Sequence, residues 1–183
     1  MKTLRIAVML ALFLMSGDLR VYSQSGLNTL KDLTELAPVI VLGKVQNVNA
    51  EFGDYLGMDN FIFTYVTVAV RFSLKGSVPK QLSVKVHGGR IGDRVLTGKR
   101  TFRFSENEEV LLFLEPTKEN YFEVYGISGK FSVITKEDGI ELFDTTLLKE
   151  DEVSRYGHGS SATVEDITTR INRYLAEKGG KGK

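Results

Sequence analysis

The stretch "FIFTYVTVAVRFSL", Phe61 to Leu74, decides the fold class. Aliphatic side chains recur at every second position, among them Ile62, Val66 and Val68, while the other face carries aromatic and polar residues. Sustained period-two alternation is typical of a β-strand, because successive side chains of a strand point to opposite faces of the sheet. A strand of this length usually coils around a small barrel and serves two sheet edges.

Further strand-like segments follow and precede this stretch. Turn-forming residues separate them, including Gly76, Pro79, Pro116 and the pair Asp138–Gly139. Short strands with turn signals between them are typical of a β-barrel or a β-sandwich. Gly43 inside the first segment indicates a bulge or bend. The expected strands are residues 39–48, 61–74, 81–86, 110–114, 121–125, 131–135 and 140–143.

Two amphipathic segments flank the strands. Leucines recur at every third position between Gly26 and Leu36, just before Pro38, which predicts a short helix. Near the carboxyl end, Thr163 stands three residues before Asp166 in an approximate capping box, and an apolar stripe follows up to the glycine pair 179–180. The sequence thus predicts one mainly β (α+β) domain over residues 24–178, with an N-terminal helix, a C-terminal amphipathic helix and a flexible tail, 179–183.

The first residues have the layout of a secretory signal peptide. Lys2 and Arg5 precede an apolar run from Ile6 to Met15, after which the chain becomes polar. The run is shorter than the roughly 20 apolar residues of a membrane-spanning helix. We predict that residues 1–23 are removed, with cleavage after Ser25 as an alternative, and that the mature protein is secreted or periplasmic. The other interpretation of this run is a buried N-terminal helix.

The composition argues against several kinds of site. The chain of 183 residues has a net charge of +1 and no cysteine, which excludes disulfides, thiolate ligands and a cysteine nucleophile. The two histidines, His87 and His158, are far apart, whereas zinc needs three or four protein ligands. The side-chain oxygens of Asp54, Asp59 and Asn60 make a calcium site the alternative, because calcium prefers oxygen ligands. We favour a hairpin loop of turn-forming residues there, and predict no metal and no cofactor.

The segment "VKVHGGRIGDRVLTG", Val84 to Gly98, shares only its glycines with known phosphate and oxyanion loops. A Walker loop needs Lys followed by Ser or Thr, but Lys99 is followed by Arg100. The triplet 87–89 would need a G-x-S-x-G elbow elsewhere to serve a lipase. The acidic cluster 106–109 is more typical of a solvated turn than of a glycosidase acid pair. We predict a sharp, glycine-permitted turn between strands, and no catalytic residues.

Charge is unevenly distributed along the chain. Residues 71–103 contain nine basic residues and one acidic residue, whereas residues 105–166 contain fifteen acidic and five basic residues. OB barrels bind nucleic acids and oligosaccharides on basic faces that also carry aromatic side chains for stacking. In this chain Phe61, Phe63 and Tyr65 would supply such aromatic side chains. Alternatively, the aromatics face a second core under a helix, and basic and acidic strands neutralise each other. The residues predicted to hold an anionic ligand are Lys85, Arg90, Arg94, Lys99, Arg100 and Arg103.

Several motifs together carry a resemblance that covers roughly residues 36–133. The order of segments resembles a family of secreted, mostly uncharacterised bacterial proteins, which are similar in turn to the netrin-like domain of tissue inhibitors of metalloproteinases. The resemblance implies a five-stranded OB-like closed barrel with helices beside it. The inhibitors bind the target's zinc through an N-terminal cysteine, which this chain lacks, so that mechanism does not carry over. The matching residues are Val41, 43–45, 65–70, 74–76, Gly88, Gly89, Gly92, 109–114 and 129–131.

These observations lead to three functional hypotheses. The first is a secreted, non-enzymatic binding module for an extracytoplasmic protein or an anionic polymer, with nucleic acid the less favoured ligand. The second is a protease inhibitor or protease-associated domain, by analogy of fold, and fold does not determine function. The third is a hydrolase whose catalytic residues are dispersed in the sequence and converge in a pocket.

Overall fold

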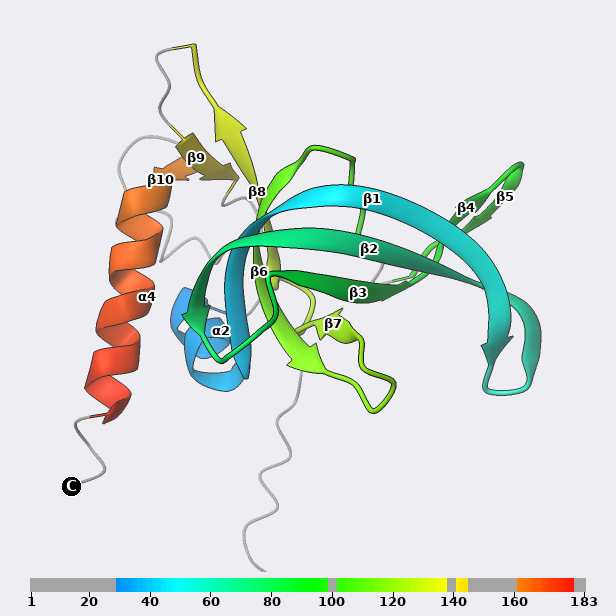
Figure 1. Ribbon diagram of the computed structural model, residues 1–183, viewed down its shortest axis with the longest axis horizontal. Helices are drawn as coiled ribbons and strands as arrows, with labels where there is room; N and C mark the ends of the chain where they lie inside the picture. Colours follow the sequence, from blue (N-terminus) through cyan, green and yellow to red (C-terminus); the bar gives the residue numbers. More distant parts are fainter. Residues whose placement is uncertain (1–28, 99–101, 138–140, 145–160, 180–183) are drawn as a thin grey trace, which may run out of the picture.

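The computed structural model describes residues 29–98, 102–137, 141–144 and 161–179. The predicted signal peptide, His158 and residues 180–183 of the predicted tail lie outside these ranges. The described part of the chain is mainly β, with helices α2 (Leu30–Leu36) and α4 (Val164–Gly179) near one end (Figure 1). The predicted fold class is therefore confirmed at the level of a mainly β chain with two flanking helices.

Every strand expected within the described residues is present, although several differ in length. The first two are much longer than expected, and they meet at a two-residue turn formed by Leu56 and Gly57. The hairpin predicted around Asp54, Asp59 and Asn60 is present, but its loop is shorter than predicted, because these three residues belong to the two strands. The strands are β1 (Val39–Tyr55), β2 (Met58–Lys75), β3 (Gln81–His87), β4 (Gly89–Ile91), β5 (Arg94–Leu96), β6 (Glu109–Pro116), β7 (Phe122–Val124), β8 (Lys130–Thr135), β9 (Glu141–Asp144) and β10 (Ser161–Thr163).

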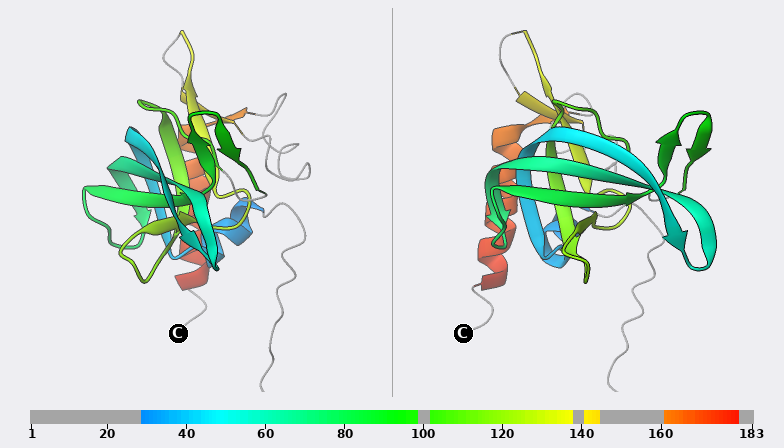
Figure 2. Two further views of the ribbon diagram at one scale, coloured as in Figure 1. Left: turned by 90° about the vertical axis from the view of Figure 1, so that its right-hand side faces the viewer. Right: turned by 45° about the vertical axis from the view of Figure 1, so that its right-hand side comes forward.

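Most of the strands form one sheet, in the order β1-β2-β3-β7-β6-β8-β9-β10, and β1 also pairs with β6. The pairing of β3 with β7 is parallel, and the other pairings are antiparallel. Strands β4 and β5 form a separate hairpin, so the predicted turn between strands contains a small sheet of its own. Figures 1 and 2 show that this hairpin and the β1–β2 hairpin project from the end of the molecule opposite the helices.

The paired strands β1 and β6 are buried on both faces. Val41 lies opposite Leu112, and both side chains face a core formed by strand residues such as Val66. The adjacent pair, Ile40 and Phe113, faces a second core that the helices cover. Because each face of this strand pair is covered, its sequence is a continuous apolar run without the alternation of a half-exposed strand.

The helices cover the second core through short apolar stripes. Helix α2 begins at a capping box in which Thr29 and Asp32 exchange hydrogen bonds with each other's backbone N–H groups, and it buries Leu30 and Leu33. Helix α4 buries Ile167 and Ile171 on the same core. The predicted cap of α4 is confirmed, since the Asp166 N–H donates to the Thr163 hydroxyl at 3.0 Å.

Two lysines hold the carboxyl end of α2. The Lys75 ammonium donates to the carbonyl oxygens of Thr34 and Glu35 at 2.8 and 3.2 Å, and the Lys178 ammonium donates to the Glu35 carbonyl at 3.0 Å. Cations are favourable there because the last carbonyls of a helix carry partial negative charge. Burial, together with the nearby charge of Lys178, lowers the pKa of Lys75.

The predicted alternation of the Phe61–Leu74 stretch holds over its first half. Ile62, Val66 and Val68 are buried, whereas Phe72, expected on the same face, is 55% exposed. The change coincides with a register shift in the β1–β2 ladder between Leu42 and Gly43, which confirms the predicted bulge. A bulge increases local twist and turns the side chains that follow it away from their previous direction.

Gly89 allows the β4–β5 hairpin to lie directly against β2. An added Cβ at this position would lie 2.2 Å from the Thr64 hydroxyl oxygen, and the backbone φ is +143°. The Thr64 hydroxyl in turn donates to the Gly88 carbonyl oxygen at 2.7 Å, in a buried position. Gly89 therefore serves a close approach between two parts of the chain.

Replacing Gly89 by Ala should destabilise the protein strongly. Overpacking and an unfavourable backbone conformation each cost about 1–3 kcal/mol, so we expect the free energy of unfolding in urea to fall by about 3 kcal/mol. Gly92→Ala is the matched control, because Gly92 has φ +57° but no atom within 4 Å of the added Cβ. That variant should lose only about 1 kcal/mol, and equal losses for the two variants would contradict the close-approach argument.

Candidate functional site

The candidate site is a cavity of about 490 Å³ between the β1–β2 ladder, the β4–β5 hairpin and the segment 102–105. We call it the arginine cavity. Val48 and Ala50 line it from β1, and Thr64 lines it from the inner face of β2. Phe102 and Phe104 supply aromatic walls from the segment that precedes β6. Its volume falls within the roughly 300–1,000 Å³ of small-molecule sites in proteins.

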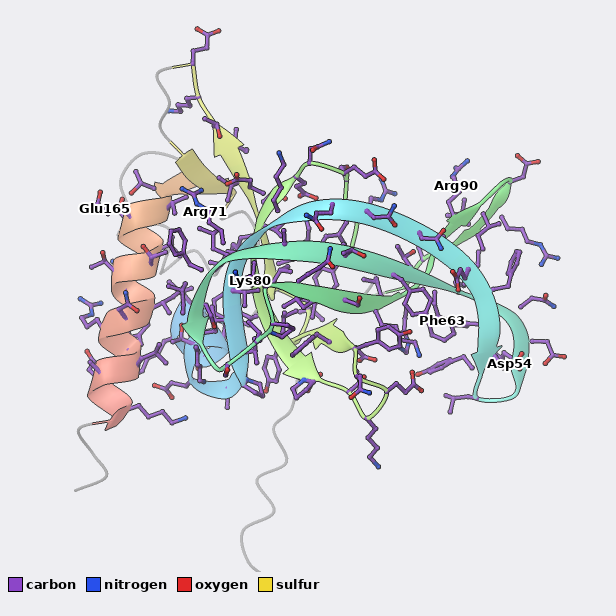
Figure 3. All side chains as sticks on the ribbon, in the orientation of Figure 1. Asp54, Phe63, Arg71, Lys80, Arg90 and Glu165 are labelled. Carbon is purple, nitrogen blue, oxygen red and sulfur yellow. The ribbon has the colours of Figure 1, made fainter. Side chains whose placement is uncertain are left out.

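Two of the predicted cations, Arg90 and Arg103, line this cavity together. Arg90 comes from β4, and Arg103 comes from the strand-free segment beyond β5. Both residues are exposed, and neither forms a salt bridge within the part of the chain that the structure describes. Figure 3 shows Arg90 on the β4–β5 hairpin and Phe63 on the other side of the β2–β3 ladder. The lining of the cavity therefore combines apolar side chains and three hydroxyl groups with two arginines.

Lys85 lies on the outer face of β3, where acidic residues neutralise it. Its ammonium group contacts the Glu119 carboxylate at 2.7 Å and lies 4.6 Å from the centroid of the Phe63 ring. Burial opposes the charged form of Lys85, but the hydrogen bond to Glu119 and nearby negative groups outweigh it, so its pKa is raised. Lys85 is thus a structural cation, and the structure does not place it at the arginine cavity.

The other three predicted cations are Arg94, Lys99 and Arg100. Arg94 stacks 5.6 Å from the centroid of the Phe52 ring, on the outside of the hairpins. Lys99 and Arg100 lie outside the described residues. Arg71, which belongs to the same basic segment, forms a salt bridge with Glu109 at 3.2 Å. The alternative in which basic and acidic strands neutralise each other therefore holds for Arg71 and Lys85, and within the described residues it does not hold for Arg90 and Arg103.

The aromatic residues of the outer face form a cluster with a histidine. The His87 ring lies 4.7 Å from the Tyr55 ring and 5.3 Å from the Phe63 ring, and Phe61 also contacts it. Its Nε2 atom lies 3.5 Å from the Glu123 carboxylate. Tyr55, His87 and Glu123 line a smaller cavity of about 190 Å³. Phe61 and Phe63 contact each other and His87, and neither belongs to the core that the helices cover. The alternative in which these aromatics face a second core under a helix therefore does not hold for Phe61 and Phe63.

A largely buried ion pair holds the wall of the arginine cavity. The Glu108 carboxylate accepts hydrogen bonds from the Lys130 ammonium, the Ser132 hydroxyl and, at 3.0 Å, the Ser105 backbone N–H. The same Lys130 ammonium lies 5.0 Å from the centroid of the Phe104 ring. Burial opposes the charged carboxylate, but these hydrogen bonds outweigh it, so the pKa of Glu108 is lowered.

Glu108 is largely buried beside Lys130, so the prediction of a solvated acidic turn is wrong for this residue. Its neighbour Glu106 is exposed as predicted, but Glu108 points into the fold because the turn brings it beside Lys130 on β8. One signal was present: an acid immediately before a fully apolar strand is placed to pair with a cation on the neighbouring strand. The sequence alone does not identify that neighbour.

Comparison with known proteins gives no match to a protein-family model or to a curated protein. Among the described residues, no helix combines the length and the apolar character needed to cross a bilayer. In the same part of the chain, no three His, Asp or Glu side chains lie close enough to hold a metal ion.

The contribution of Glu108 to stability should depend on pH. Its lowered pKa means that the stabilisation is complete above the unfolded value, near 4.5, and is lost as the pH falls through the lower folded value. Breaking a buried pair costs on the order of 3 kcal/mol, so Glu108→Gln should lower the free energy of unfolding by about that amount at pH 7.

The difference between wild type and Glu108→Gln should therefore shrink steadily between pH 4.5 and pH 2.5, as measured by urea unfolding. Glu106→Gln, at an exposed position two residues away, is the control and should stay within about 0.5 kcal/mol of wild type. A difference that stays constant down to pH 2.5 would show that the Glu108 carboxylate has no stabilising partners.

Proposed function

We propose that the described strands form a five-stranded OB-like closed barrel. The support is the pairing pattern: β1 pairs with β2, β2 with β3, β3 with β7, β7 with β6, and β6 again with β1. A sheet whose last strand pairs with its first has no open edge at that point. The two very long, curved strands also suit a small barrel, in which strands must tilt and coil.

We propose further that the protein is a secreted, non-enzymatic binding module that holds an anionic ligand in the arginine cavity. One observation carries this proposal: Arg90 and Arg103, from separate segments, line one cavity with apolar walls and form no salt bridge among the described residues. Unpaired guanidinium groups favour carboxylate, sulfate or phosphate, to which they donate two hydrogen bonds in a planar arrangement.

The size of the cavity limits what the ligand can be. A volume of about 490 Å³ suits one small anionic molecule, or one unit of an anionic polymer that runs along the outside. The apolar walls favour a ligand that carries a hydrophobic or ring portion next to its charged group. A protease-inhibitor function gains no support, because the mature amino terminus on which it would depend lies outside the described residues. No contact described above adds to the hydrolase hypothesis.

Replacing both Arg90 and Arg103 by Ala should abolish most anion binding. We expect a loss of at least tenfold in affinity for heparin oligosaccharide or polyphosphate by calorimetry, and a salt slope lower by about one per lost contact. The control removes two cations elsewhere, with Lys118→Ala and Arg173→Ala. Binding that weakens equally in the two double variants would reflect net charge alone and would overturn the assignment of the cavity.

A further inference from the structure

The turn that joins β1 to β2 places an apolar residue in an unfavourable position. Leu56 and Gly57 have φ values of +51° and +78°, and Tyr55 pairs with Met58 across them. Positive φ at both central residues defines a type I′ turn, which favours Asn or Gly at its first position. Leu56 is also 84% exposed, more than any other large apolar residue in the described part of the chain.

The backbone conformation of Leu56 and the exposure of its side chain are therefore both unfavourable in the isolated chain. A left-handed conformation is unfavourable for an ordinary L-residue. Exposure of the side chain also forgoes the stabilisation that burial of a leucine would contribute. Residues in strained backbone conformations cluster at functional sites. The function indicated here is contact with another surface.

Further exposed apolar side chains lie on the two hairpins at this end of the molecule. Phe52, Met58 and Val95 are each about half exposed. Met58 and Val95 line the same cavity of about 360 Å³, and Arg94, which stacks on Phe52, lines it too. Figures 1 and 2 show that both hairpins bearing these residues project from the same end of the molecule. This end, which we call the hairpin surface, thus presents an exposed leucine and a partly apolar hollow, whose lining also includes Asp59 and Asn60.

The charges of the hairpin surface are complementary to each other. The β1–β2 hairpin carries Glu51, Asp54 and Asp59 without a basic residue between positions 51 and 59. The β4–β5 hairpin carries Arg90 and Arg94 against a single acid. Figure 3 shows Asp54 near the tip of the first hairpin and Arg90 on the second. A surface that holds both a knob and a hollow, and both signs of charge, can pair with itself about a two-fold axis.

We propose that the hairpin surface binds a second copy of this chain, with Leu56 of each copy entering the hollow beside Val95 of the other. The acids that flank the tip argue against an anionic bilayer as the occupant, because like charges repel. The acidic hairpin of one copy faces the basic hairpin of the other in the two-fold arrangement. Burial of Leu56 in the pair also recovers the free energy that its exposure forgoes.

The variant Leu56→Asn tests docking without lowering the stability of the fold. Asparagine before glycine is the preferred type I′ pair, so this variant should have an unchanged or higher melting temperature. In sedimentation equilibrium of the full chain, measured up to about 1 mM because small interfaces are weak, wild type should show a monomer–dimer equilibrium. The variant should dissociate at least tenfold more readily. Ile134→Thr removes another half-exposed apolar residue, outside the hairpin surface, and should dimerise as wild type does.

Three outcomes would overturn the proposal. The first is a wild-type protein that stays monomeric at every concentration. The second is a dimer that Leu56→Asn leaves intact. The third is a monomer that binds phosphatidylglycerol vesicles through Leu56, which would assign the hairpin surface to a lipid bilayer. Anion binding at the arginine cavity should survive Leu56→Asn, so failure of the dimer and failure of the proposed function are distinguishable.

Discussion

The double burial of the β1–β6 strand pair is the constraint on which the rest of the structure depends. Neighbouring pairs such as Val41–Leu112 and Ile40–Phe113 send their side chains to opposite cores, so this strand pair is the wall that both cores share. A polar residue on either face would be buried without water, at a cost of a few kcal/mol. The helices are therefore required to cover the second face, and the lysines at the end of α2 secure one of them.

The end of the molecule away from the helices is different because β1 leaves β6 after Lys44. Beyond that point β1 pairs only with β2, and the two strands continue as a long hairpin that the helices do not reach (Figure 1). Cavities and exposed apolar side chains collect there, since fewer layers cover these strands. The protein thus divides into a two-core half that supplies stability and a hairpin half that offers surface for binding.

The charged residues that are unevenly distributed along the sequence have different roles in different parts of the fold. Arg71 and Lys85 reach acids on neighbouring strands, and Glu108 reaches Lys130, so these charges serve the fold. Arg90 lies on β4, whose ladder partner is β5, and Arg103 lies on the strand-free segment before β6, so neither arginine is placed opposite an acid in a described ladder. Pairing across strands is therefore what separates structural cations from those that are available to a ligand.

Local pattern determined much of this protein from sequence alone. Period-two alternation located strands such as residues 61–74, and β-branched or apolar runs between turn signals located others. Apolar stripes, with the Thr163 cap for the second, located the helices, and Gly43 marked the bulge, because each signal acts through residues that are near in sequence. Tertiary structure alone decided that Arg90 and Arg103 line one cavity, that Glu108 pairs with Lys130, and that Leu56 forms the turn. Those outcomes depend on strand register and on which strands become neighbours, and such long-range contacts leave no periodic signal in a single sequence.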